Sequence, residues 1–229
     1  MKYIIVGMGN FGAYLSVRLT EMGHEVIGVD SKMGKIDLIK DKLTHAVNLD
    51  ATDLSAVKTL PYKEADVAIV SIGEDFGSSI MATAIFKQLQ VKRLISRSNS
   101  PLHHTVLEAI GVDEIIHPEE ESAERLSKRL EMTGVIDSLN LSENYAIIEA
   151  EAPERYIGRS IAEIDLRGNY NINVLTILRF EEKQTIFGVT QQRKKAQGVV
   201  SPQMKIKKDD ILVLFGDMKD IQKVMNMNQ

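Results

Sequence analysis

Short apolar runs alternate with stretches of helical periodicity along the first half of the chain. The apolar runs predict strands over Lys2–Val6, Glu25–Val29, Thr44–Asn48, Ala65–Ile72, Arg93–Ser96 and Glu114–His117. Helices are predicted between them, over Ala13–Met22, Met33–Lys42, Asp53–Leu60, Gly77–Leu89 and Pro101–Ile110. The fourth strand is apolar almost throughout, as a strand covered on both faces should be. This alternation predicts an α/β fold with a Rossmann-like, doubly wound parallel sheet.

The pattern changes in the second half of the chain. Pro118–Glu131 is a charged helix with a thin apolar side, and Gly134–Ser142 is typical of a connection. Strands are predicted over Tyr145–Ala150, Asn173–Arg179, Thr185–Val189 and Ile211–Phe215, helices over Ser160–Asp165 and Met218–Met225, and a polar loop over Gln191–Gly198. The strands are short and outnumber the helices, which predicts a smaller α+β domain. We therefore expect domains over 1–133 and 144–229, joined by a linker over 134–143.

A glycine motif follows the first predicted strand directly. Gly7 suits a tight turn, Gly9 lets a pyrophosphate approach the main chain, and Gly12 lets the next helix pack on the strand. The unpaired N–H groups of that helix then face the phosphates. Asp30, at the tip of the second strand, can accept both ribose hydroxyls and would repel a 2′-phosphate. The motif therefore favours NAD(H), ADP or ATP over NADP.

Composition narrows the function classes. The chain has 229 residues, a formal net charge of −4 and no cysteine. The charge gives no reason to expect a nucleic-acid partner, and disulfides and thiolate metal sites are excluded. No apolar run has the length of a membrane span. We therefore expect a cytoplasmic protein that reaches the inner face of the membrane only through a partner.

Several stretches together resemble the RCK family, also called KTN, the cytosolic regulators of potassium channels and transporters. They are VGMGNFGAYLSVRLTEMGHEVIGVD, DAT, ADVAIVSIGED, SPLHHTVLEAIGVDEIIHPE and DDILVLFGDMKDI. The likeness covers nearly the whole chain. It implies a TrkA_N-like nucleotide-binding domain (RCK_N) and a TrkA_C-like domain (RCK_C).

The resemblance also implies a nucleotide site. Its residues are Gly7, Met8, Gly9, Asn10, Phe11 and Gly12 at the phosphate turn, Asp30, Ser31 and Lys32 at the ribose, Asp50, Ala51 and Thr52 at the adenine, Ser71, Ile72 and Gly73 at the crevice, and Arg97 and Glu119. In some members the counterpart of Glu119 faces the partner subunit's nucleotide and helps to bind a divalent cation. Several ATP-responsive members have arginine where this chain has Asn10, which weakens the case for ATP over ADP or NAD(H).

Two further stretches are candidate sites. The resemblance implies a cyclic di-AMP site in the second domain, near Ile164, Asp165, Arg167 and Tyr170, although Arg167 fits a surface or intrachain salt bridge equally well. The adjacent His103 and His104 point apart on a helix, so we expect surface or interface residues there and no shared metal ion.

The sequence favours a regulator over an enzyme. No tyrosine is followed four residues later by lysine, and the last histidine is His117, so a catalytic substrate domain is poorly supported. The resemblance implies dimers, paired through the helices after Gly73 and Pro101, that assemble into an octameric ring. Such a ring would act on an integral-membrane potassium-translocating subunit of the TrkH/KtrB kind. The alternative is a small NAD-dependent oxidoreductase.

Overall fold

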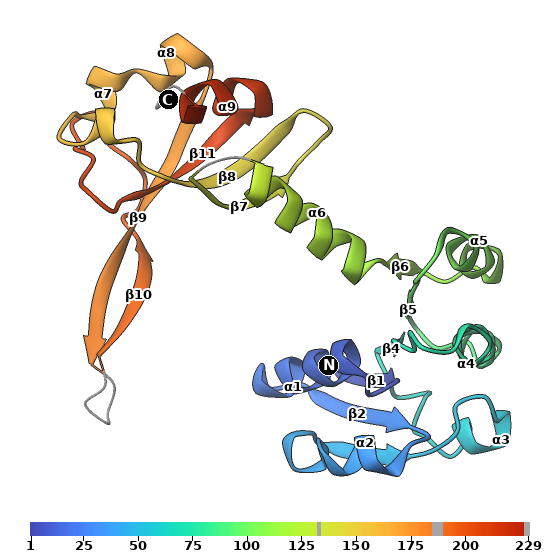
Figure 1. The fold of residues 1–229 in the computed structure, drawn as a ribbon. Coiled ribbons are helices and arrows are strands. Elements are labelled where there is room, and N and C mark those ends of the chain that lie inside the picture. Colours follow the sequence, from blue (N-terminus) through green and yellow to red (C-terminus); the bar gives the residue numbers. More distant parts are fainter. Residues whose placement is uncertain (132–133, 185–189, 227–229) are drawn as a thin grey trace. The chain divides into compact units, whose positions relative to one another are not determined.

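The computed structural model describes residues 1–131, 134–184 and 190–226 (Figure 1). Their contacts divide the chain into two compact units, Met1–Glu119 and Glu120–Gln229. Among the described residues, no helix is both long and apolar enough to cross a bilayer.

The first unit is built on a parallel sheet of six strands in the order β3-β2-β1-β4-β5-β6. The strands are β1 (Lys2–Val6), β2 (Glu25–Asp30), β3 (His45–Asn48), β4 (Val67–Val70), β5 (Leu94–Arg97) and β6 (Glu114–Ile116). From β1, the strands β2 and β3 follow on one side of the sheet, and β4, β5 and β6 follow on the other side. This confirms the doubly wound fold and creates a crevice at the carboxyl ends of β1 and β4.

Helices connect these strands. They are α1 (Asn10–Glu21), α2 (Met33–Asp37), the short 3-10 helix η1 (Lys40–Lys42), α3 (Leu54–Val57), α4 (Phe76–Gln88) and α5 (Pro101–Ile110). Asp53, Asp75 and Ser100 cap the starts of α3, α4 and α5 with their side chains. The continuous helix predicted over Met33–Lys42 is wrong, because Ile39 leaves the helical backbone at φ −125°. The broken form still buries Ile36 and Ile39.

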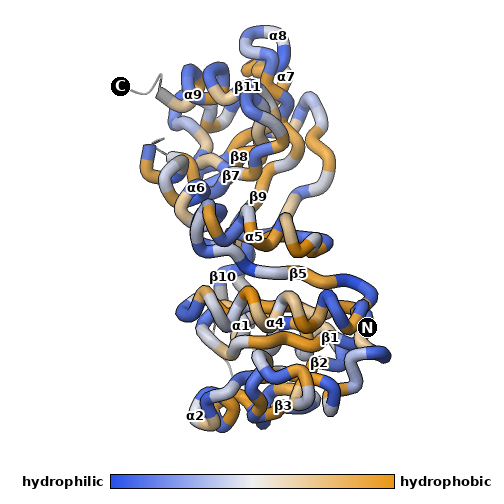
Figure 2. Tube along the Cα trace, turned by 90° about the vertical axis from the view of Figure 1, so that its right-hand side faces the viewer, coloured by the Kyte–Doolittle hydropathy of each residue, from blue (hydrophilic) through white to orange (hydrophobic). Residues whose placement is uncertain are grey.

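Both faces of the sheet are covered. Ile4 and Val6 of β1 belong to one buried cluster, which includes Phe86 of α4. Ile5 points the other way, into a second cluster with Ile36 of α2. Side chains of a strand alternate between faces, so the continuous apolar run at residues 4–6 of β1 (β1 in Figure 2) is what burial on both faces requires.

The second unit is built on an antiparallel sheet of five strands in the order β10-β9-β11-β8-β7. The strands are β7 (Val135–Asn140), β8 (Tyr145–Glu151), β9 (Asn173–Gln184), β10 (Thr190–Ala196) and β11 (Ile211–Asp217). Its helices are α6 (Pro118–Glu131), η2 (Glu154–Tyr156), α7 (Ile161–Ile164), α8 (Leu166–Tyr170) and α9 (Met218–Asn226). Alternate residues of β8, Ala146, Ile148 and Ala150, are buried in one core with Ile221 of α9.

The expected linker over 134–143 is wrong in part, because most of it is the edge strand β7. A register shift between Val135 and Asp137 interrupts its alternation of buried and exposed residues. Asp137 accepts hydrogen bonds from Arg125 of α6 at 2.6 and 2.8 Å. The charged helix therefore packs beside the strand that follows it.

The polar loop expected over Gln191–Gly198 is also wrong, because most of it is β10. Beyond Leu178, β9 pairs only with β10, and the two strands extend past the rest of the sheet as a ribbon (Figure 1). Residues 192–196 of β10 are exposed at every position, so their polar sequence does not alternate. Gly216 lies inside β11 and does not end it. The strand expected over Thr185–Val189 lies outside the described residues.

A buried ion pair fixes the end of this sheet. Asp210 is only 2% exposed, and its carboxylate accepts hydrogen bonds from Arg179 of β9 at 2.8 and 3.0 Å. The same carboxylate accepts the backbone N–H of Lys207 at 2.8 Å. Asp210 therefore holds the turn before β11 against the neighbouring strand.

Replacing Arg179 with methionine should leave Asp210 buried without its cation. We expect Arg179→Met to lower the free energy of unfolding by roughly 2–4 kcal/mol, below the upper values for buried pairs because the arginine is partly exposed. Lys195→Met, which removes an exposed pair with Glu181, should change it by less than about 1 kcal/mol. Urea unfolding followed by circular dichroism measures both, and equal effects would contradict a special role for Asp210.

Candidate functional site

A cavity of about 420 Å³ lies at the carboxyl ends of β1 and β4. All the residues predicted for the nucleotide site line it, except Met8 and Gly12. Residues that the sequence reasoning missed also line it: Val6, Lys35, Leu49, Glu74, Asp75 and Ser78. Lys35 could have been found from helical spacing, since it lies three residues after the predicted Lys32.

Two of the three glycines are required by packing. Gly7 has φ +95°, a conformation that side chains disfavour. A Cβ on Gly12 would lie 2.0 Å from the carbonyl oxygen of Gly7 and 2.4 Å from the hydroxyl of Ser71. That hydroxyl lies 2.9 Å from the carbonyl oxygen of Val6 and 2.8 Å from that of Gly7, and donates to them. Ser71 therefore ties β4 to the glycine turn.

The third glycine, Gly9, faces open space. A Cβ there would meet no atom within 4 Å, and its φ of −73° suits any residue. Gly9 is the N-cap of α1, yet no side chain caps this helix. In the part of the chain that the structure describes, the N–H groups of Asn10, Phe11 and Gly12 have no hydrogen-bond partner. An uncapped helix N-terminus beside a cavity is suited to bind an anion.

Asp30 holds the glycine turn from the neighbouring strand. It is 8% exposed, and its Oδ2 accepts the backbone N–H of Met8 at 2.7 Å. Its Oδ1 accepts the N–H of Lys32 at 2.8 Å. Each carboxylate oxygen has further acceptor capacity, so the predicted ribose contact stays a prediction. Met8 itself is buried in the core, and only its main chain belongs to the turn.

The predicted adenine side has its own local structure. Asp50 Oδ1 accepts the backbone N–H of Thr52 at 2.9 Å and its hydroxyl at 2.7 Å. These two hydrogen bonds lower the pKa of Asp50 below its ordinary value. The turn is thereby fixed in shape at the rim of the cavity.

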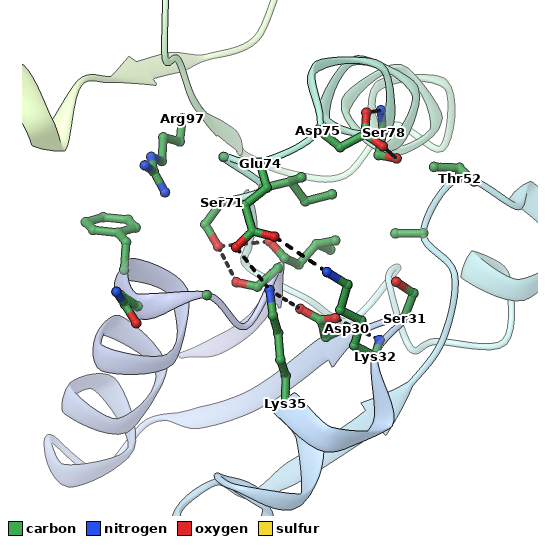
Figure 3. A pocket seen from close by; sticks show the side chains of 18 of the residues that line it. Asp30, Ser31, Lys32, Lys35, Thr52, Ser71, Glu74, Asp75, Ser78 and Arg97 are labelled. Carbon is green, nitrogen blue, oxygen red and sulfur yellow. Dashed lines mark hydrogen bonds and ion pairs between the residues drawn. The ribbon is translucent and has the colours of Figure 1, made fainter.

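Arg97 and Glu119 form an ion pair on the opposite side of the cavity (Figure 3 shows Arg97). Both the Nε and the Nη2 of Arg97 donate to the carboxylate of Glu119. The guanidinium also lies 6.0 Å from the centre of the Phe11 ring. Within the described residues, no three His, Asp or Glu side chains are grouped as a metal site requires, so a divalent cation at Glu119 stays a prediction.

The two adjacent histidines diverge, as expected, but His103 is fully buried and does not lie on the surface. Its Nδ1 lies 3.0 Å from Asn99 Oδ1, and Asn99 Nδ2 donates to the carbonyl oxygen of Gly73 at 2.9 Å. Burial lowers the pKa of His103. His104 turns the other way and lies 2.9 Å from a ring nitrogen of His117. His103 therefore belongs to a hydrogen-bond chain that reaches the cavity wall.

The residues predicted for a second ligand have structural positions in α7 and α8. Ile164 is 5% exposed and belongs to the core of the second unit. Asp165 has φ 45° and caps α8 by accepting the N–H of Gly168 at 3.0 Å. Arg167 is exposed. Their role toward cyclic di-AMP stays a prediction.

Comparison with known proteins agrees with both halves of the fold. Residues 3–118 match the TrkA-N domain, and residues 145–228 match the TrkA-C domain. The chain belongs to the RCK family. The parallel six-stranded sheet is its TrkA-N domain, and the antiparallel unit contains its TrkA-C domain.

Individual RCK relatives match over nearly the full length. The Ktr system potassium uptake protein C of Bacillus subtilis (strain 168) is 33% identical, over 97% of this chain and 95% of the relative. The Ktr system potassium uptake protein A of the same organism is 29% identical, over 98% and 96%. Among solved structures, the GsuK RCK domain shares the fold with a TM-score of 0.64 at 15% identity, covering 98% of this chain and 47% of that chain.

Replacement by alanine should have different effects at Gly9 and at Gly12 of this RCK site. Gly9→Ala should lower the free energy of unfolding by less than about 1 kcal/mol, since only the cap preference changes. It should weaken adenine-nucleotide binding, because the new methyl group occupies the open face of the turn. Gly12→Ala should destabilise the free protein by about 1–3 kcal/mol through overpacking. Thermal unfolding without and with ADP separates the two, and a stable Gly12→Ala variant would contradict the packing described.

The buried His103 predicts a pH dependence of stability. Its pKa is lowered in the folded protein, so the unfolded chain binds the proton more readily. Stability should therefore fall as the pH drops below the ordinary value of 6.5, with no contribution well above it. Urea midpoints at pH 7.5 and 5.5 should differ less in His103→Gln than in the wild type. The exposed His45, changed to glutamine, is the control; an unchanged pH dependence in His103→Gln would contradict this assignment.

Proposed function

We propose that this chain is a nucleotide-sensing regulatory subunit of a Trk/Ktr-type potassium uptake system. One observation is central: an uncapped helix N-terminus and a buried carboxylate meet in a cavity at the switch point of the sheet. The chain around this cavity is similar over almost its full length to two Ktr system potassium uptake proteins. Together, the site and the family support a binding role coupled to potassium uptake.

NAD(H), ADP and ATP are the ligands proposed for the cavity. The free N–H groups of Asn10, Phe11 and Gly12 would bind phosphate oxygens. Asp30 lies at the tip of β2, where it would accept ribose hydroxyls and repel a 2′-phosphate. A solved protein of the same fold, the GsuK channel, is bound to NAD, which supports keeping NAD(H) among the candidates.

The signal is proposed to pass through subunit contacts. Met81 of α4 and Leu102 of α5 are 53% and 68% exposed, and these helices are the ones expected to pair two first units. Leu126 and Leu130 of α6 are also exposed and could pack on a second copy. In this proposal dimers form an octameric ring, which acts on a potassium-translocating membrane subunit at its cytoplasmic face. A ligand that binds two ring arrangements unequally shifts their populations.

Native mass spectrometry and thermal unfolding test the proposal together. The freshly purified protein should appear as a homo-oligomer, dimeric or larger, and at least one of NADH, ADP and ATP should raise its unfolding temperature. At a ligand concentration about 100 times Kd, the expected stabilisation is about 2.7 kcal/mol. Gly9→Ala should remove the shift while preserving the oligomer.

A cellular assay tests the potassium role. The chain, expressed in a bacterium that retains a Ktr-type membrane subunit but lacks its regulatory subunits, should restore growth at low potassium, and the Gly9→Ala variant should not. A monomer that no nucleotide stabilises would refute the proposal. Steady turnover of NADH with a metabolite would instead support the oxidoreductase alternative.

A further inference from the structure

The cavity has an unusual balance of charge for a site proposed to bind phosphates. Five carboxylates line it but only three cations, Lys32, Lys35 and Arg97. Position 10, at the start of α1, supplies a neutral asparagine. Besides the free N–H groups of α1, these three cations are the lining groups that can compensate the charge of a bound pyrophosphate.

Arg97 already forms an ion pair with Glu119. Its Nε and Nη2 both donate to Glu119, and only 16% of its side chain is exposed. Paired, partly buried arginine–carboxylate contacts of this kind are among the stronger hydrogen bonds. A phosphate would have to displace Glu119 to reach this guanidinium.

Lys35 is placed differently. Its Nζ lies 3.9 Å from Asp30 Oδ2, the same oxygen that accepts the N–H of Met8 in the glycine turn. The side chain is 29% exposed, against 66% for Lys32. The ammonium group is therefore held between the second strand and the phosphate turn, pointing from α2 into the cavity (Figure 3).

Glu74 forms ion pairs with both lysines. Its carboxylate lies 3.5 Å from the Nζ of Lys32 and 3.9 Å from that of Lys35, and the three side chains converge in Figure 3. Glu74 is 75% exposed, so these are long, solvated ion pairs of small net value. Such a carboxylate can be exchanged for another anion at little cost.

We propose that Lys35 is the phosphate-binding cation of this site, and that Glu74 is the anion which the ligand's phosphate replaces. This inference depends on the proposed nucleotide binding. Lys35 would then select ligands by charge: it adds affinity for ADP and NAD⁺ but none for adenosine. Glu74 would oppose binding, both as a competitor for the lysines and as a negative charge beside the phosphates. Once displaced, Glu74 would no longer hold the segment next to Asp75, the residue that caps α4.

Calorimetry on the full-length protein tests the charge exchange. Lys35→Gln should weaken ADP and NAD⁺ binding about tenfold, the value of one charge-assisted hydrogen bond. Lys35→Arg, which keeps the charge, should restore most of that loss. Glu74→Gln should strengthen ADP binding about threefold. Adenosine, measured by competition, should bind all four proteins alike, and Lys42→Gln, an exposed lysine outside the cavity, should match the wild type.

The outcomes separate this inference from the proposed function. If the wild type binds none of NADH, NAD⁺, ADP and ATP, the proposed nucleotide site itself is refuted. If the wild type binds ADP and folded Lys35→Gln binds it equally well, only the role of Lys35 is overturned. A loss in Lys35→Gln confined to NADP⁺ would also overturn it, because the ammonium would then read a 2′-phosphate. Unchanged ADP affinity in Glu74→Gln would refute the exchange.

Discussion

The hydrogen bond between the Asp30 carboxylate and the backbone N–H of Met8 joins the parts on which the site depends. It links the end of β2 to the glycine turn after β1, across the register in which Val6 pairs with Val29. The other carboxylate oxygen accepts the N–H of Lys32, which sets the start of α2. Since the carboxylate is nearly buried, losing either partner would leave a charge poorly compensated. One side chain thus fixes the turn, the strand end and the helix that carries Lys35.

The glycine turn separates structural from binding requirements. Gly12 brings α1 against the turn so closely that no side chain fits, which aims the helix N-terminus at the cavity. Gly9 has space around it and no such constraint. Because the first is needed for packing and the second is not, only the second is free to serve a ligand. The motif therefore combines a glycine required for packing, Gly12, with a glycine that leaves space for a ligand, Gly9.

Local signals made the first unit predictable from sequence. The strand, glycine turn, helix and acid of Lys2–Asp30 act within thirty residues, so their spacing alone indicates the site. The second unit shows where this fails. The alternation of β7 is interrupted by a register shift, and β10 is polar because its residues 192–196 are all exposed. Glu74 lies in the loop after β4 and Lys35 lies in α2, and nothing local indicates that they meet. The burial of His103 likewise depends on Phe76 of α4, which only the fold brings near.

The cavity wall at Gly73 is joined to α5 by a short chain of hydrogen bonds. Its carbonyl oxygen accepts the side chain of Asn99, which in turn contacts the buried His103 of α5. On its other side, Gly73 lies against the guanidinium of Arg97, which a Cβ at this position would approach to 2.7 Å. Glu74, which a phosphate is proposed to displace, directly follows Gly73. A shift of this segment would either move Asn99 with it or break the hydrogen bond between Asn99 and Gly73. If the proposed anion exchange moves this segment, the Asn99–Gly73 hydrogen bond is the contact through which α5, a helix of the proposed subunit pairing, would sense it.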